Sequence, residues 1–160
     1  MPVQYMETIR ARYARLGYAP YRWFEASTPP PWQALPRPLA RLRLGLLSTS
    51  GAYVRGQRAY HYRDDCSVRA IPVDTPDSAL RFSHITENYL VDARRDPSCI
   101  LPLATLRKLV SRGVIGALAS NVLSCMGGIY SQRRVREETA PAVLDAFRAE
   151  GVEAALLVAM

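Results

Sequence analysis

The sequence lacks any long apolar run. None of its 160 residues form a stretch approaching the roughly 18 apolar residues that a membrane span needs. Charges are spread through the first 17 residues, so the apolar core of a secretory signal is missing as well. These absences predict a protein with no membrane partner, located in the cytoplasm.

Cysteine is scarce. The three cysteines, Cys66, Cys99 and Cys125, are an odd number and show no C-x-x-C spacing. This pattern argues against a disulfide framework and against a zinc site. We therefore expect reduced thiols and no metal.

Lysine is nearly absent, since Lys108 is the only one, although the formal net charge is +7. The arginines are scattered, and the longest groups are Arg94-Arg95 and Arg133-Arg134-x-Arg136. A nucleic-acid binder usually gathers its charge on one face or carries a recognisable module. The pattern favours a solvated basic surface with at most one anion pocket, and no nucleic-acid partner.

The chain divides by composition into two parts. Residues 1–38 begin with apolar residues at helical spacing up to Gly17, which predicts an amphipathic helix. Residues 18–38 then hold six prolines and both tryptophans, so they cannot form a regular element. We expect an arm that packs over the domain or against a partner. Residues 39–160 are predicted to form an α/β domain with one core.

Within that domain, strands are predicted at 42–47, 80–85, 114–119 and 154–159, and loops at 52–66 and 120–130. A helix is predicted over 102–112, and another from a Thr139 cap to Gly151. Strand, loop, helix and strand at this spacing indicate a βαβ unit. The expected class is three-layer α/β with a mainly parallel sheet, Rossmann- or flavodoxin-like. Because the sequence stops on a strand, we expect the domain to be incomplete at its C-terminal end.

Three places carry residues suited to chemistry. Ser48, Thr49, Ser50 and Gly51 follow a strand, where hydroxyls and backbone N–H groups either bind an anion or satisfy their own turn. Ser83 and His84 lie near the end of another strand, where the imidazole acts as an acid or base or has a structural role. Cys125 lies beside Gly127 and Gly128 and is either an exposed nucleophile or a small core residue.

An ordered series of motifs then resembles the selenoprotein B group of the glycine, sarcosine, betaine and D-proline reductases. The matching pieces are Arg69-Ala70-Ile71-Pro72-x-Asp74-Thr75, Leu80-Arg81-x-Ser83-His84, Asp96-Pro97-Ser98-Cys99-Ile100-Leu101-Pro102-Leu103-x-x-Leu106, Gly113-Val114-Ile115-Gly116-x-Leu118-Ala119 and Met126-Gly127. The family pattern has a second histidine two positions after the first, where this chain has Thr86. The resemblance covers about three-quarters of the chain.

The resemblance implies a redox motif, selenocysteine or cysteine followed three positions on by cysteine, directly after a strand like 154–159. Met160 lies where this motif would begin. Since UGA encodes selenocysteine and is ordinarily read as a stop, we expect an in-frame UGA after Met160; the competing explanation is a fragment or frameshift of a cysteine-containing relative. The implied protein is an oxidoreductase subunit acting on a small amino-acid-like or amine substrate. The 160-residue chain alone would be inactive.

The implied partners are other reductase subunits, one of them with a pyruvoyl group, and a thioredoxin-like electron donor. No cofactor is expected in this chain itself. Ser48, Thr49, Ser50, Gly51, Ser83, His84, Gly127 and Gly128 would line the substrate pocket. The alternative is a non-catalytic α/β binding module with an anion pocket and a partner-docking arm. The incomplete enzyme predicts an exposed apolar edge and self-association, whereas the module predicts a monodisperse chain.

Overall fold

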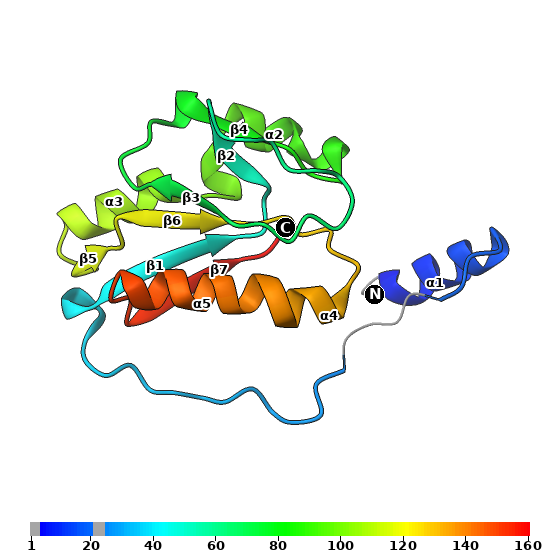
Figure 1. Ribbon diagram of the computed structural model, residues 1–160, viewed down its shortest axis with the longest axis horizontal. Helices are drawn as coiled ribbons and strands as arrows, with labels where there is room; N and C mark the ends of the chain where they lie inside the picture. The colour runs from blue at the N-terminus through cyan, green and yellow to red at the C-terminus, as the bar shows by residue number, and fades with distance from the viewer. Residues whose placement is uncertain (1–3, 21–24) are drawn as a thin grey trace. The chain divides into compact units, whose positions relative to one another are not determined.

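The computed structural model describes residues 4–20 and 25–160 and divides the chain into two units, Met1–Trp32 and Gln33–Met160. In the first unit, helix α1 spans Tyr5–Arg15 (Figure 1). Gly17 follows it with a φ of +79°, a left-handed conformation that commonly ends helices. The predicted N-terminal helix is therefore confirmed.

The predicted arm is only partly within the described residues, since residues 21–24 lie outside them. Trp32 of the arm is 92% exposed. Docking of the arm on a partner stays a prediction. Near the end of the arm, Arg37 forms an ion pair with Glu153, with 2.6 Å between nitrogen and oxygen. No helix in the described ranges has the length and apolarity to cross a membrane.

The second unit is organised around strand β1 (Arg43–Ser48). Strand β7 (Ala154–Val158) pairs with it in parallel along one side. On the other side β1 pairs in parallel with β5 (Ala117–Leu118) and β6 (Asn121–Ser124) (Figure 1). Strand β3 (Arg69–Pro72) completes the sheet, antiparallel to β6. The sheet is mixed but mainly parallel, as predicted.

Strands β5 and β6 correct the prediction for residues 114–130. The expected strand at 114–119 is reduced to β5, and the expected loop at 120–130 contains β6. Leu44 of β1 lies opposite Leu118, whereas Leu47, three residues on, lies opposite Leu123, five residues further along. Between these two pairings the chain therefore has two more residues than β1 has, and they separate β5 from β6. The short pattern of β6, in which polar residues enclose only Val122 and Leu123, explains why it resembles a loop in sequence.

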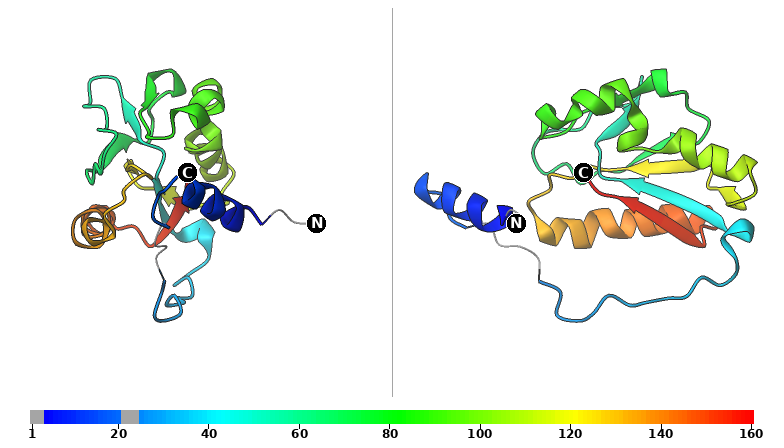
Figure 2. Two further views of the ribbon diagram at one scale, coloured as in Figure 1. Left: turned by 90° about the vertical axis from the view of Figure 1, so that its right-hand side faces the viewer. Right: turned by 180° about the vertical axis from the view of Figure 1, so that it is seen from behind.

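Helices cover both faces of the sheet, which confirms the three-layer α/β class (Figure 2). Helices α2 (Leu90–Arg95) and α3 (Leu103–Ser111) supply core residues on one face. On the other face, Gly45 of β1 lies against the ring of Phe147. That ring belongs to α5 (Ala140–Ala149). The buried core comprises Leu44, Leu46, Ala52, Ile71, Leu80, Phe82, Leu90, Ala93, Leu101, Leu103, Leu106, Ile115 and Val122.

The last helix begins earlier than predicted. Ser131 caps α4 (Gln132–Arg134), and a π turn, Val135–Thr139, joins α4 to α5. Thr139 has helical dihedrals and donates its hydroxyl hydrogen bond to the carbonyl oxygen of Cys66, so the predicted Thr139 cap is wrong. Pro141 lacks an N–H group and crowds the turn before it, and the widened π turn lies there.

A small second sheet corrects two further predictions. Strand β2 (Ala52–Val54) lies in the predicted loop 52–66 and pairs antiparallel with β4 (Leu80–Phe82). The strand predicted at 80–85 therefore ends three residues early. Single 3₁₀ turns occupy Leu39–Arg41, Asp77–Ala79, Glu87–Tyr89 and Pro97–Cys99.

Candidate functional site

The carboxyl ends of β1, β6 and β7 meet at one edge of the sheet, because these strands are parallel (Figure 1). The segment Ser48–Gly51 leaves β1 there, and Cys125–Gly128 leaves β6. His84 joins them, since the Gly127 N–H lies 3.2 Å from its Nε2. The structure thus brings the three candidate places of the sequence together. This is where α/β proteins usually bind ligands.

His84 is the titratable group at the centre of this edge. Its side chain is only 5% exposed. Nδ1 lies 2.6 Å from the Thr86 hydroxyl and 3.1 Å from the Thr86 nitrogen. Burial lowers the pKa of His84, although the Thr49 carbonyl and the charge of Glu87 act in the opposite direction. The lowered pKa favours the neutral imidazole, whose Nε2 accepts the hydrogen bond of the Gly127 N–H.

Backbone N–H groups of the loop after β1 donate their hydrogen bonds to other groups of the protein. The Thr49 N–H donates to the Val158 carbonyl at 3.0 Å, and the Gly51 N–H to the Cys125 carbonyl at 2.9 Å. The Ser48 hydroxyl donates to the Ile100 carbonyl at 2.6 Å. These groups are not available to an anion, which removes the main support for an anion pocket formed by this loop.

Ser50 differs from its neighbours. It is fully buried, and its hydroxyl has no hydrogen-bond partner among the described residues. A buried polar atom without a partner costs free energy, so such an atom often marks a place where a ligand or a water binds. Ser83, by contrast, donates its hydroxyl to the Tyr60 carbonyl at 3.1 Å.

The two glycines after β6 are required by close packing. A Cβ on Gly127 would lie 2.9 Å from His84 Nε2 and from the carbonyl oxygens of Thr49 and Met160. A Cβ on Gly128 would overlap the side chain of Ile85. Gly127 and Gly128 thus allow the backbone to approach His84 closely.

Cys125 does not have the features of an activated nucleophile. It is buried, and burial, followed by the neighbouring Cys66, raises its pKa to about 11. The thiol form is therefore favoured at neutral pH, while a nucleophilic cysteine needs its thiolate. The geometry supports the core interpretation of this residue.

The role of Thr86 was missed in the sequence, and so was the contact of Thr49, a predicted pocket residue, with Met160. Thr86 holds the His84 ring through Nδ1, and Thr49 accepts a hydrogen bond from the Met160 N–H at 2.9 Å. A hydroxyl two residues after a histidine is a local signal for the first contact. The second joins residues 111 positions apart, so no local pattern indicates it.

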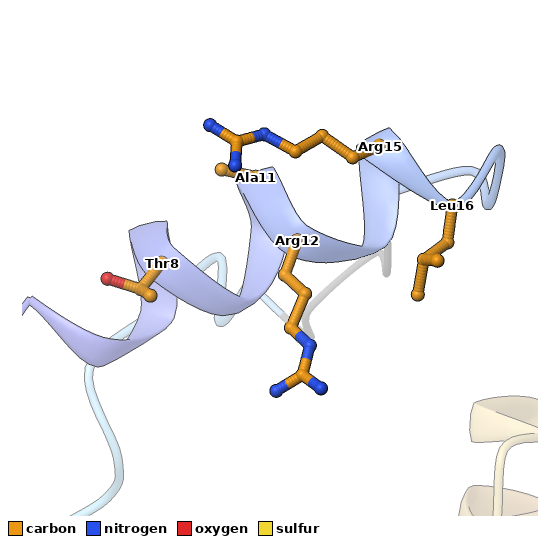
Figure 3. A pocket seen from close by; sticks show the side chains of 5 residues that line it. All are labelled: Thr8, Ala11, Arg12, Arg15 and Leu16. Carbon is orange, nitrogen blue, oxygen red and sulfur yellow. The ribbon is translucent and has the colours of Figure 1, made fainter.

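Two other features of the described residues do not contribute to this site. A shallow hollow on α1 is lined by Thr8, Ala11, Arg12, Arg15 and Leu16 (Figure 3). Four of the five belong to α1 and Leu16 directly follows it, and Arg12 and Arg15 project to opposite sides, so they do not converge on a ligand. Within the described ranges, no three histidine, cysteine or acidic side chains gather in a way that would hold a metal ion.

The fold and this edge define an α/β protein whose candidate site lies at the carboxyl ends of parallel strands. The chain is similar to D-proline reductase subunit gamma of Acetoanaerobium sticklandii, with 32% identity over 133 residues. The match covers 82% of this chain and 54% of the relative, so the chain spans about half the length of the curated relative it matches. No family model and no solved structure match it. The similarity supports a relationship to proline and glycine reductases.

The lowered pKa of His84 predicts a pH dependence of stability. Between the folded pKa and the unfolded value of about 6.5, the unfolded chain binds more protons than the folded chain. The unfolding free energy should therefore decrease as pH falls below about 6.5. Urea unfolding from pH 7.5 to 5 measures this slope. His84→Gln should flatten it, whereas an unchanged slope in His84→Gln would contradict the assignment.

Proposed function

We propose that this chain forms the N-terminal part of a selenoprotein-B-like reductase subunit. It acts by selenol or thiol redox chemistry on a small amino-acid-like or amine substrate. The observation that carries the proposal is the position of Met160 beside His84. The similarity to a D-proline reductase subunit supports it.

Strand β7 directs the polypeptide into the candidate site. Thr49 holds the Met160 N–H, and the carbonyl oxygen of Met160 and His84 Nε2 each lie 2.9 Å from the position of a Cβ on Gly127. A residue following Met160 therefore starts beside the imidazole. We place the nucleophile of the native protein at this point.

The surrounding residues fit a selenol or thiol. Such a group supplies a nucleophile for the bound substrate and is restored by exchange with a second thiol. His84, neutral and buried, accepts or holds a proton next to it. The unpartnered hydroxyl of Ser50 offers a polar contact at the same edge of the sheet. The other proposed pocket residues shape the site through the hydrogen bonds and close packing described above.

The same proposal includes the remaining components of the reaction. Other reductase subunits bind this one, one of them contributing a pyruvoyl group that activates the substrate. A thioredoxin-like protein supplies electrons in the cytoplasm. D-proline, glycine, sarcosine and betaine are the probe substrates, the first from the name of the relative and the others from the family resemblance.

An uncovered β7 predicts self-association of the 160-residue chain. Among the described residues β7 pairs only with β1, and Leu157 is 67% exposed. Parallel strands are usually buried on both faces, so this apolar edge favours pairing with another chain. Leu157→Lys should lower the associated fraction in sedimentation velocity. Leu144→Lys, on the exposed side of α5, is the matched control. Equal effects of the two changes, or a monodisperse parent chain, would contradict this prediction.

The nucleotide sequence after codon 160 tests the proposal. The expected result is an in-frame UGA or cysteine codon, a two-residue spacer and a cysteine codon, with a selenocysteine-insertion hairpin in the UGA case. A UAA or UAG codon at this position would overturn it.

A further inference from the structure

The connection between β2 and β3 presents three unpaired arginines. Arg55, Arg58 and Arg63 are exposed in this loop, which we call the arginine loop (residues 55–67). None of their side chains has a hydrogen bond or ion pair with the described residues. Arginines elsewhere, such as Arg94 and Arg134, are neutralised by nearby glutamates. The three guanidiniums of the loop are therefore not paired with carboxylates, although Asp64 and Asp65 leave residues 55–67 with a net charge of only +1.

The acidic residues of the same loop, Asp64 and Asp65, accept hydrogen bonds from backbone groups and are partly exposed. Asp64 accepts hydrogen bonds from the N–H groups of Tyr130 and Ser131, at 2.6 and 3.2 Å. Asp65 accepts from the N–H groups of His61 and Ser67, at 2.8 and 3.0 Å. Both carboxylates thus hold the backbone of the loop and nearby residues in place. None of the three guanidiniums has such a contact with the described residues, so the arginine side chains are left to bind elsewhere.

The loop is fixed by buried and polar anchors. The Tyr60 ring is only 4% exposed, and its hydroxyl donates to the Ser124 carbonyl at 2.6 Å. The guanidinium of Arg69 stacks 4.4 Å from that ring, and its Nε donates to the Arg58 carbonyl. Gln57 bridges the loop base, accepting from the Val54 N–H and donating to the Ala70 carbonyl. These contacts fix the backbone of the loop, so that binding has to order only the exposed side chains.

The same loop also carries an exposed aromatic side chain. Tyr62 is 63% exposed, and its ring lies against His61 with 4.6 Å between ring centres. Tyrosine and arginine are the residues that most often dominate protein–protein binding energy. The base of the loop also borders the candidate site. The backbone carbonyl of Tyr60 accepts a hydrogen bond from the hydroxyl of Ser83, and Ser83 directly precedes His84. A protein bound here would lie at the rim of that site.

We propose that the arginine loop is a docking surface for an acidic protein surface. Its three guanidiniums are suited to two-point contacts with carboxylates, and Tyr62 supplies the apolar anchor. A nucleic acid is disfavoured because neutralising many phosphates needs a longer basic stripe than three arginines form. This inference does not depend on the redox chemistry proposed above.

Poly-L-glutamate is the probe, with binding followed by fluorescence anisotropy at several salt concentrations. Arg55→Glu/Arg58→Glu/Arg63→Glu should weaken binding by about tenfold or more. The control is Arg41→Glu/Arg112→Glu/Arg148→Glu, which has the same net charge and changes exposed arginines elsewhere. It should lose much less affinity. Circular dichroism establishes that both variants fold.

Two further measurements sharpen the test. Tyr62→Ala should weaken binding about threefold without changing its salt dependence, since it removes no charge. Single-stranded DNA of matched charge should bind more weakly than poly-L-glutamate. Equal losses in the two triple variants would overturn the proposal, because binding would then follow net charge alone. Tighter binding of DNA through the same arginines would overturn it in favour of a nucleic-acid surface.

Discussion

The purified 160-residue chain is expected to show no turnover of any of the four probe substrates with dithiothreitol as reductant. Cys66 and Cys125 are buried, and the pKa of Cys125 is raised to about 11. Cys99 is exposed but belongs to the turn Pro97–Cys99, outside the segments that meet at His84. The chain therefore lacks a thiolate at the carboxyl ends of the strands. The native protein, assayed with its partner subunits, should turn over at least one probe.

Turnover by the 160-residue chain would contradict the placement of the nucleophile after Met160. The matched variants Cys125→Ser and Cys99→Ser then identify the source. Loss of activity in Cys125→Ser alone would show that the buried thiol reacts despite its raised pKa. Loss in Cys99→Ser alone would move the reaction to the surface.

Replacing Gly51 with alanine is expected to destabilise the protein by about 3 kcal/mol or more. Gly51 has a φ of +63°, a conformation that costs other residues about 1–2 kcal/mol. A Cβ at this position would also overlap the backbone carbonyl oxygen of Ser83. Because that carbonyl precedes His84, relief of the overlap must displace the imidazole or the β1 loop. Urea unfolding at pH 7 measures the loss.

Gly113→Ala separates the two causes. Gly113 has a similar φ of +71°, but a Cβ there meets no atom within 4 Å. Its substitution should cost only the backbone strain, about 1–2 kcal/mol. If both variants lost the same stability, the close contact between the β1 loop and Ser83 would be absent in solution.

Much of the fold is predictable from apolar patterning. The leucines of β1 and the helical spacing of α3 indicated their elements because each buries an apolar face, and β7 was indicated by its continuous apolar run although its side chains stay partly exposed. Strand β6 was missed because only Val122 and Leu123 are apolar in it. Its assignment depends on pairing with β1 and β3, which are distant in sequence.

The candidate site was predictable in location but not in detail. Parallel strands bring their carboxyl ends together, which places Ser48 near Gly127, whereas His84 follows β4 of the second sheet and was assigned to the same pocket only through the family resemblance. Which donors remain free depends on pairs such as Gly51 with Cys125, which lie 74 residues apart (125 − 51). Local sequence therefore suggested an anion loop whose N–H groups are in fact used by the protein.

Mass spectrometry of the native protein tests the central claim most directly. The peptide that contains Ala154 to Met160 is isolated after proteolysis of protein purified from its own cells. The account predicts that this peptide continues beyond Met160 into selenocysteine or cysteine, with an alkylated selenol or thiol next in the chain. A native peptide that terminates at Met160 would contradict the account, because the group expected beside His84 would then not exist.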